Sequence, residues 1–183
     1  SRAPLPTLWQ HTPKSLIENR IHNGRGAQYY YEMAVVYAYS HFLASCDTEF
    51  ALILEDDVLP GPPTLRQMLE AVDSDTVAVV AHYPCHIQGH SMVWRRERSG
   101  AVTHFPARRS GVEEVSGSGF GCSLLRVSAL RDLPIQTRVF EHPPKWYDYV
   151  AFFHLGAKGK ILCNWDVDAE HVRTERFLQG PAA

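Results

Sequence analysis

Apolar and polar residues alternate in blocks along the chain, and the apolar blocks are short and unbroken. The runs Phe50–Leu54, Val77–Ala81 and Phe120–Leu125 contain almost no charged residue. Continuous apolar runs of this length are typical of strands buried on both faces of a sheet. Lys160–Cys163 predicts a further short strand near the C-terminal end.

Helical spacing of apolar residues fills the intervals between these runs. It predicts a helix over residues 28–45 and a second helix that starts at Thr64, which forms a capping-box pattern with Gln67. A third helix is predicted over Trp146–Leu155, and Gly156 stands where a glycine past the last turn is expected. Strands and helices therefore alternate.

The remaining segments predict less regular structure. Residues 1–26 form an irregular lead-in, and residues 82–115 contain loops with edge strands near Met92–Trp94 and Val102–Phe105. The alternation of apolar strands with helices predicts a single α/β domain over residues 1–183, with a mostly parallel sheet flanked by helices.

Composition changes this picture little. The chain has 183 residues, 45% of them hydrophobic and 21% charged, which argues against global disorder. A net charge of −2 gives no reason to expect nucleic-acid binding. The four cysteines contain no CxxC pair, which argues against a zinc site. No apolar stretch reaches the roughly eighteen residues of a membrane helix, so we expect a cytoplasmic protein, or a soluble domain trimmed from a longer chain.

Three carboxylates, Glu55, Asp56 and Asp57, follow directly after the first apolar run. Ligands of open α/β sheets bind beyond the carboxyl ends of the strands. Adjacent carboxylates repel one another, and hard divalent ions prefer carboxylate oxygens and commonly bridge to phosphates. A solvated acidic loop is the alternative interpretation, but the buried strand before it favours a cation site.

Phe50–Pro63, with the sequence FALILEDDVLPGPP, resembles the DxD segment of GT-A glycosyltransferases, particularly the family-2-like enzymes. Later segments resemble further landmarks of that family in the same order: Ser116–Arg126, Trp146–Asp148, Leu155–Ile161 and His171. The resemblance implies a GT-A (Rossmann-like) fold and a metal-dependent transfer of a sugar from a nucleotide-sugar donor to an acceptor hydroxyl, with inversion.

The resemblance also implies a metal site. Asp57 would be the main metal-binding carboxylate, supported by Asp56, and His171 would be the second protein ligand. A mixed imidazole and carboxylate set suits Mn²⁺ better than Mg²⁺. Glu55 and Asp56 would also contact the nucleotide sugar.

Asp148 would be the general base that takes the proton of the acceptor hydroxyl. Its alternative role is a negative charge favoured at a helix N-terminus. The aromatic residues Trp146 and Tyr147 would line the acceptor side, because aromatic faces stack on sugars; core packing is the alternative for them.

The glycine-rich segment and one basic residue complete the implied donor site. Gly117, Ser118 and Gly119 would let the backbone approach the donor, although plain turn glycines are an alternative. Arg25 resembles a residue that contacts the diphosphate. Family members have a strand, a helix and a second strand before this point, so the resemblance implies either a shortened N-terminal nucleotide-binding half or one that this sequence includes only in part.

Two other functions stay open. A nucleotidyltransferase shares the logic of paired carboxylates and a metal, whereas the late histidine and Asp148 favour glycosyl transfer. A catalytically degenerate GT-A domain acting as a binding module is the non-enzymatic alternative. No GxxxxGK[ST] motif occurs, which excludes a P-loop enzyme. The sequence identifies neither the donor sugar nor the acceptor.

Overall fold

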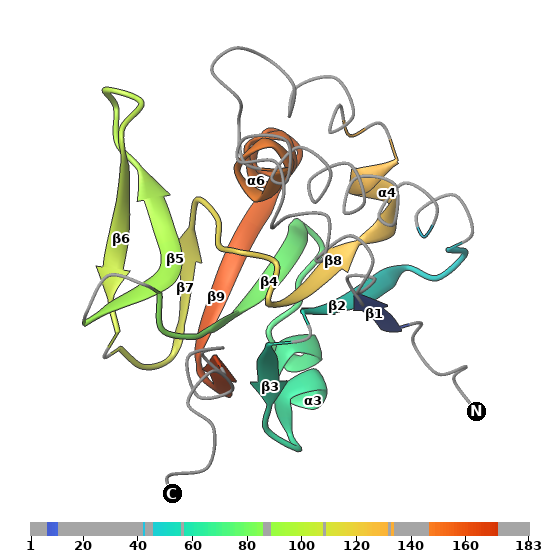
Figure 1. Ribbon diagram of the computed structural model, residues 1–183. Helices are drawn as coiled ribbons and strands as arrows, with labels where there is room; N and C mark the ends of the chain where they lie inside the picture. The colour runs from blue at the N-terminus through green and yellow to red at the C-terminus, as the bar shows by residue number, and fades with distance from the viewer. Residues whose placement is uncertain are drawn as a thin grey trace, which may run out of the picture.

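The computed structural model describes residues 7–10, 42, 46–55, 57–85, 89–107, 109–131, 133 and 147–171. These residues form a mixed α/β fold with one seven-stranded sheet and a separate two-stranded hairpin (Figure 1). In chain order the elements are β1 (Thr7–Gln10), β2 (Phe50–Glu55), β3 (Val58–Pro60), α3 (Thr64–Glu70), β4 (Thr76–His82), β5 (His90–Arg96), β6 (Val102–Pro106), β7 (Val112–Val115), β8 (Cys122–Arg126), α4 (Val127–Leu130), α6 (Tyr147–Gly156) and β9 (Lys160–His171).

The large sheet has the order β1-β2-β8-β4-β9-β3, and β7 also pairs with β9. The pairs β1–β2 and β4–β9 are parallel, while β8 runs antiparallel between β2 and β4. Strands β3 and β7 are antiparallel to β9. The prediction of a mostly parallel sheet was therefore wrong in this respect. A strand buried on both faces is uniformly apolar whichever way it runs, so its pattern contains no information on direction.

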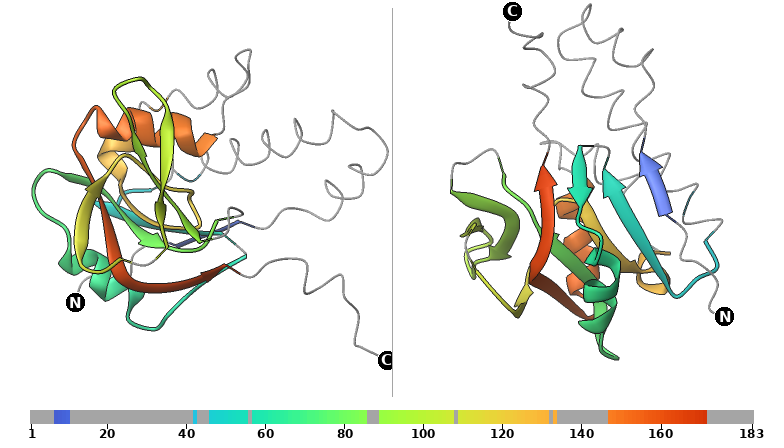
Figure 2. Two further views of the ribbon diagram at one scale, coloured as in Figure 1. Left: turned by 90° about the vertical axis from the view of Figure 1, so that its left-hand side faces the viewer. Right: turned by 90° about the horizontal axis from the view of Figure 1, so that it is seen from below.

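Side chains of the central strands alternate between two hydrophobic layers. Helices α6 and α3 lie on opposite sides of the sheet (Figure 2). On β2, Leu52 and Leu54 pack on the face covered by α3, where Met68 is fully buried. Ile53 points to the opposite face, in the cluster that contains Phe152 of α6. Both faces of β2 are therefore covered by packed side chains, up to the carboxyl end of the strand.

Strand β9 is much longer than the predicted Lys160–Cys163, and it extends to His171. Its pairing with β4 shifts between Ala81 and His82, whose partners are Asn164 and Asp168. Such an irregularity bends a strand and redirects its end. The C-terminal end of β9 consequently leaves β4 and pairs with β3.

The hairpin of β5 and β6 stands beside the sheet (Figure 1). Both strands match the edge strands predicted for this region, whereas β7 was not predicted. Gly100 closes the hairpin turn with φ +86°, a conformation that favours glycine. Trp94 of β5 is 1% exposed, and its ring stacks on Tyr149 of α6 at 4.9 Å. The hairpin is therefore anchored to the core through Trp94.

Two local predictions at helix ends were wrong. Pro63 occupies the N-cap of α3 and Thr64 is its first residue, so no side-chain capping bond forms. The backbone N–H of Gln67 instead donates to the carbonyl of Pro63 at 3.0 Å. Gly156 is the last residue of α6 and has no positive φ, unlike a glycine past the last turn. The predicted helix over residues 28–45 lies outside the described residues, apart from Phe42 and the loop at its end.

In the described part of the chain, no helix is both long enough and apolar enough to cross a membrane.

Candidate functional site

The pairing of β3 with β9 brings the predicted metal-binding residues together. Val58 of β3 stands opposite His171 of β9, so Asp57, the residue before Val58, lies beside the end of β9. The Nε2 atom of His171 is 3.1 Å from Oδ2 of Asp57. The two side chains are 27% and 43% exposed, respectively, which leaves the pair accessible to a ligand.

The other ring nitrogen of His171, Nδ1, contacts a backbone carbonyl. Nδ1 lies 3.2 Å from the carbonyl oxygen of Pro84. A carbonyl oxygen only accepts, so Nδ1 must hold a proton. In the neutral ring, Nε2 then presents its lone pair to a carboxylate oxygen of Asp57. Two electron-rich atoms at this distance require a proton or a metal cation to hold them together.

This donor set fits the predicted metal. Metal-binding histidines commonly donate their second ring N–H to a backbone carbonyl, as His171 does to Pro84. One imidazole and one carboxylate suit Mn²⁺, whose further ligands would be substrate and water oxygens. Within the described residues, no group of three or more His, Cys, Asp or Glu side chains could hold a metal ion. In this part of the chain Asp57 and His171 thus stand as a pair, and their binding of a metal stays a prediction.

Glu55, the last residue of β2, contacts the first residue of α6. The hydroxyl of Tyr147 donates to Oε1 of Glu55 at 2.7 Å. Tyr147 is 9% exposed, and its ring lies 5.8 Å from that of Phe120. Tyr147 was predicted to line the acceptor side, but the structure places it in the interior.

Asp148 lies in the first turn of α6, next to Tyr147. Its Oδ1 accepts the backbone N–H of Tyr149 at 2.7 Å. Burial raises the pKa of Asp148 from 3.8 to about 6, although backbone hydrogen bonds oppose the shift. A carboxylate whose pKa lies near neutrality is suited to accept a proton in catalysis.

Tyr83 lies near these acidic residues and was not predicted as a site residue. It follows β4, is 2% exposed, and its ring lies edge-on to that of His171 at 5.7 Å. Burial raises the pKa of Tyr83 well above its ordinary value, and the negative charges of Glu55, Asp148 and Asp57 contribute. These three carboxylates therefore all lie within electrostatic range of one buried hydroxyl. A tyrosine after a strand has no distinctive sequence signal.

The glycine-rich segment closes around Tyr83. The backbone N–H of Gly121 donates to the Tyr83 hydroxyl at 2.9 Å, and the carbonyl of Gly121 accepts the N–H of Glu55 at 3.0 Å. A Cβ on Gly119 would overlap the Tyr83 hydroxyl, and a Cβ on Gly117 would overlap the Trp94 ring. Close packing against aromatic rings thus explains why these two positions are glycine. Their predicted contact with the donor stays a prediction.

Ser118 lies between these two glycines and is fully buried. Its hydroxyl has no hydrogen-bond partner among the described residues. Three predicted site residues, Arg25, Asp56 and Trp146, lie outside the described residues.

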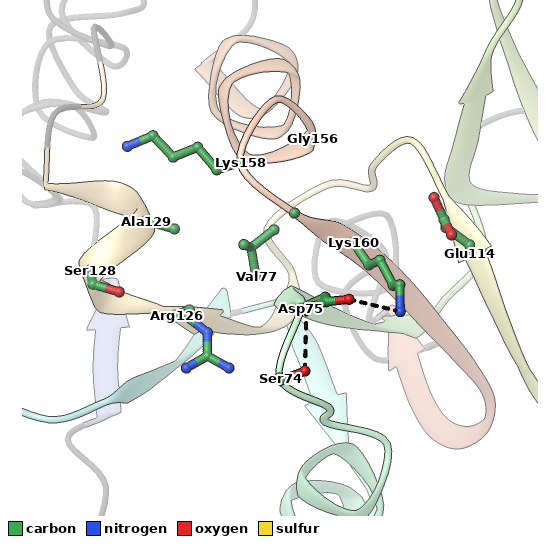
Figure 3. Close-up of a pocket in the computed structure, with 11 residues that line it drawn as sticks. Ser74, Asp75, Val77, Glu114, Arg126, Ser128, Ala129, Gly156, Lys158 and Lys160 are labelled. Carbon is green, nitrogen blue, oxygen red and sulfur yellow. Dashed lines mark hydrogen bonds and ion pairs between the residues drawn. The ribbon is translucent and has the colours of Figure 1, made fainter.

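A cavity of about 630 Å³ lies at the opposite end of the sheet (Figure 3). It is lined by residues that flank the N-terminal ends of β4 and β9, including Asp75 and Lys160. Two of its cationic side chains, Lys160 and Arg126, form ion pairs within the protein. Lys160 lies 3.1 Å from Asp73 and 3.5 Å from Asp75, and Arg126 lies 2.6 Å from Glu49. These ion pairs join strands and turns, which is a structural role. The candidate site is therefore the one at the end of the sheet that holds Asp57.

No protein-family model matches the sequence, and no curated protein matches it. Among solved structures, A197 from STIV matches with a TM-score of 0.53 and 17% identity, over 76% of this chain and 66% of that one. The UTP-bound UGPase from Acinetobacter baumannii matches with a TM-score of 0.49 and 13% identity, over 74% of this chain and 50% of that one. The inositol-1-phosphate CTP transferase from T. maritima gives 0.42 and 11%, over 81% of this chain and 64% of that one.

This chain spans about half to two thirds of the length of the structures that it matches. At these identities the likeness concerns the fold alone. The match to A197 supports the mixed α/β arrangement of the sheet and its helices.

Proposed function

We propose that this chain is the catalytic part of a metal-dependent glycosyltransferase with a GT-A fold. It would transfer a sugar, with inversion, from a nucleotide-diphosphate sugar to an acceptor hydroxyl. The observation that best supports this function is the pair of Asp57 and His171. The pair lies at the carboxyl end of the sheet, 3.1 Å apart, with the second nitrogen of His171 on the Pro84 carbonyl.

Asp57 and His171 would hold Mn²⁺, or Mg²⁺, together with the diphosphate of the donor. A divalent cation bound there neutralises the negative charge that develops on the departing diphosphate. The hydrogen bond from Nδ1 of His171 to Pro84 orients the ring and leaves Nε2 as the ligand atom. Ring contact with Tyr83 restricts His171 further.

Asp148 would accept the proton of the acceptor hydroxyl as that oxygen attacks the anomeric carbon. A pKa of about 6 makes Asp148 mostly ionised at neutral pH and still basic enough to take a proton. Its neighbours support the placement, since Tyr147 contacts Glu55 at the end of the strand that leads to Asp57. The base would then act on the acceptor hydroxyl, and the metal ligands on the diphosphate of the donor, in one reaction.

The donor site would include further residues. Gly117, Ser118 and Gly119, which are buried here, stay a predicted part of the donor site. Arg25 and Asp56 would contact the diphosphate, and Trp146 would lie on the acceptor side.

A nucleotidyltransferase is the alternative that uses the same metal logic. It would transfer the nucleoside monophosphate group of a nucleoside triphosphate to a phosphorylated substrate and release pyrophosphate, and it would not need Asp148 as a base. The two functions therefore differ in their products. The degenerate binding module would bind a glycan or a partner without turnover.

The test combines ligand binding with product analysis. Thermal unfolding would be followed with Mn²⁺ and each common nucleoside diphosphate, for the wild-type protein and for Asp57→Asn. We expect a rise in Tm that needs both ligands and disappears in Asp57→Asn. Asp47→Asn is a matched control, because Asp47 is an exposed carboxylate before β2. Absence of any shift in the wild-type protein would contradict the donor site.

Products would then separate the functions. Incubation with nucleotide sugars and Mn²⁺ should release a nucleoside diphosphate, by transfer or by slow hydrolysis. Release of pyrophosphate from a nucleoside triphosphate and a sugar phosphate would instead indicate the nucleotidyltransferase. Binding without either product would indicate the binding module.

A further inference from the structure

The hydrogen bond between Tyr147 and Glu55 joins two elements that are distant in the sequence. The hydroxyl of Tyr147 lies 2.7 Å from Oε1 of Glu55, across 92 positions of the chain. Tyr147 is 9% exposed and Glu55 is half-buried. Hydrogen bonds from a hydroxyl to a carboxylate are among the stronger ones in proteins, and partial burial strengthens them.

The two residues occupy special places in their elements. Tyr147 is the first residue of α6 and directly precedes Asp148. Glu55 is the last residue of β2 and stands two positions before Asp57. This hydrogen bond therefore joins the turn that contains the proposed base to the strand end that leads to the proposed metal ligand.

We propose that Tyr147 and Glu55 are positioning residues, which fix Asp148 relative to Asp57 and do not themselves bind substrate. This inference rests on the proposed function of the site. A buried tyrosine at 9% exposure offers little surface to an acceptor, and its hydroxyl is already directed at Glu55. The donated proton also stabilises the charge of Glu55, which lies near Asp148 and Asp57 around Tyr83.

The body of α6 is held separately. Phe152 and Leu155 are fully buried against the sheet, so loss of the Tyr147 hydroxyl should leave the helix in place. The ring contact with Phe120 should survive in Tyr147→Phe. The expected defect is thus a small displacement of the first turn of α6, and a displacement of about 1 Å can cost roughly 100-fold in rate.

The experiment compares Tyr147→Phe, Glu55→Ala, Glu55→Gln and the double variant Tyr147→Phe/Glu55→Ala. We expect kcat to fall about 10- to 100-fold in Tyr147→Phe and Glu55→Ala, with KM for the donor nearly unchanged. The double variant should be no worse than either single variant, because both remove the same bond. Glu55→Gln keeps an oxygen that accepts from Tyr147, so it should retain more activity than Glu55→Ala.

Glu49→Gln is the matched control. Glu49 precedes β2 at its other end and pairs with Arg126 at 2.6 Å, so this substitution removes a comparable carboxylate charge away from the site. Its kcat should equal that of the wild-type protein. Normal kcat in Tyr147→Phe would overturn the proposal. An equal loss of Mn²⁺ and nucleotide binding in Tyr147→Phe would also overturn it, because that result indicates collapse of the whole site.

A second measurement separates this proposal from the proposed function. Equilibrium unfolding of the wild-type protein, Tyr147→Phe, Glu55→Ala and the double variant gives a double-mutant cycle that needs no activity. If the wild-type protein neither binds nor turns over a nucleotide sugar, the proposed function fails and the positioning role fails with it. In that event a coupling of about tenfold in the unfolding constant would still verify the hydrogen bond itself.

Discussion

The imidazole of His171 faces the carboxylate of Asp57 across 114 positions of the chain, with Nε2 3.1 Å from Oδ2. The pairing of β3 with the bent end of β9 creates this contact. Since Nδ1 of His171 is committed to the Pro84 carbonyl, Nε2 is the atom available to a cation. The pair is therefore the feature of this fold that a metal ion would stabilise most directly.

We predict that His171→Ala abolishes stabilisation by Mn²⁺ with a nucleoside diphosphate. A ligand at 100 times its Kd stabilises the folded state by about 2.7 kcal/mol, and loss of a metal ligand should remove most of this. Calorimetry of metal binding and thermal unfolding would measure it. His104→Ala is the control, because His104 also has Nδ1 on a backbone carbonyl, that of Ser91 at 2.9 Å, but lies on the hairpin. Equal Mn²⁺ binding by His171→Ala and wild type would refute the assignment.

The raised pKa of Asp148 predicts a pH dependence of activity. A base must be ionised, so kcat/KM should rise with pH through an apparent pKa of about 6 and level off above it. Asp148→Asn should bind Mn²⁺ and nucleotide normally and lose turnover. A pH–rate profile of the wild-type protein, with turnover of Asp148→Asn beside it, checks both. A flat profile between pH 5 and 7 would argue against this role.

The same pKa shift means that ionised Asp148 lowers the free energy of unfolding at neutral pH. Its pKa is about 6 in the folded protein against an ordinary 3.8, so the folded state holds the proton more tightly than the unfolded state. Its favourable contribution is present below pH about 4 and is lost as pH rises through 6. Asp148→Asn should therefore stabilise the protein at pH 7, by about 1 to 3 kcal/mol. Denaturant unfolding at pH 4 and pH 7 would measure this, and unchanged stability at pH 7 would contradict the burial of Asp148.

Much of the scaffold could be predicted from the apolar pattern. The strands at Phe50 and Val77, the two hairpin strands and the helix after Trp146 all appear within a few residues of their predicted positions. Each has a strong local signal, either an unbroken apolar run or a helical stripe. Proximity of Asp57 to His171 followed only from the order of landmarks in the family that the chain resembles.

The remaining features depend on tertiary contacts. Strand β7, with the sequence VEEV, has only Val115 buried and exists because it pairs with the edge of β9. The role of Tyr83 arises from the Gly121 backbone and three carboxylates that distant segments supply. Tyr147 was predicted to line the acceptor side because aromatic faces stack on sugars, whereas its burial places it in the interior. Such relationships have no periodic signature along the chain.

Gly121 is predicted to stabilise the fold because its position leaves no room for a side chain. A Cβ there would lie 2.5 Å from Cζ of Tyr83 and 2.7 Å from Cγ2 of Val58, both in the core. Gly121→Ala should destabilise the protein by about 1 to 3 kcal/mol, since overpacking forces backbone shifts. Gly156→Ala is the control, because its nearest contact is Ile161 at 3.5 Å and alanine favours a helix. In denaturant unfolding, the free energy of unfolding of Gly121→Ala should lie well below that of the wild type. That of Gly156→Ala should equal or exceed the wild-type value.

Asp73 is predicted to make the fold sensitive to acid. Its carboxylate accepts the Thr76 hydroxyl at 2.7 Å and the backbone N–H of Asp75 at 2.9 Å, and it pairs with Lys160 at 3.1 Å. The Thr76 bond first, and then Lys160, lower the pKa of Asp73 from 3.8 to about 2. The folded state thus binds this proton less tightly than the unfolded state. The stabilisation is complete above pH about 4 and is lost as pH falls toward 2.

Asp73→Asn should therefore be less stable at pH 7 and show a flatter fall in unfolding free energy between pH 4 and 2 than the wild type. Denaturant unfolding at a series of pH values measures both quantities. Asp75→Asn is the matched control, because that carboxylate is 67% exposed and lies farther from Lys160, at 3.5 Å. Its pH dependence should follow the wild type. If Asp73→Asn keeps the steep acid dependence, the bonds to Thr76 and Lys160 do not stabilise the turn before β4.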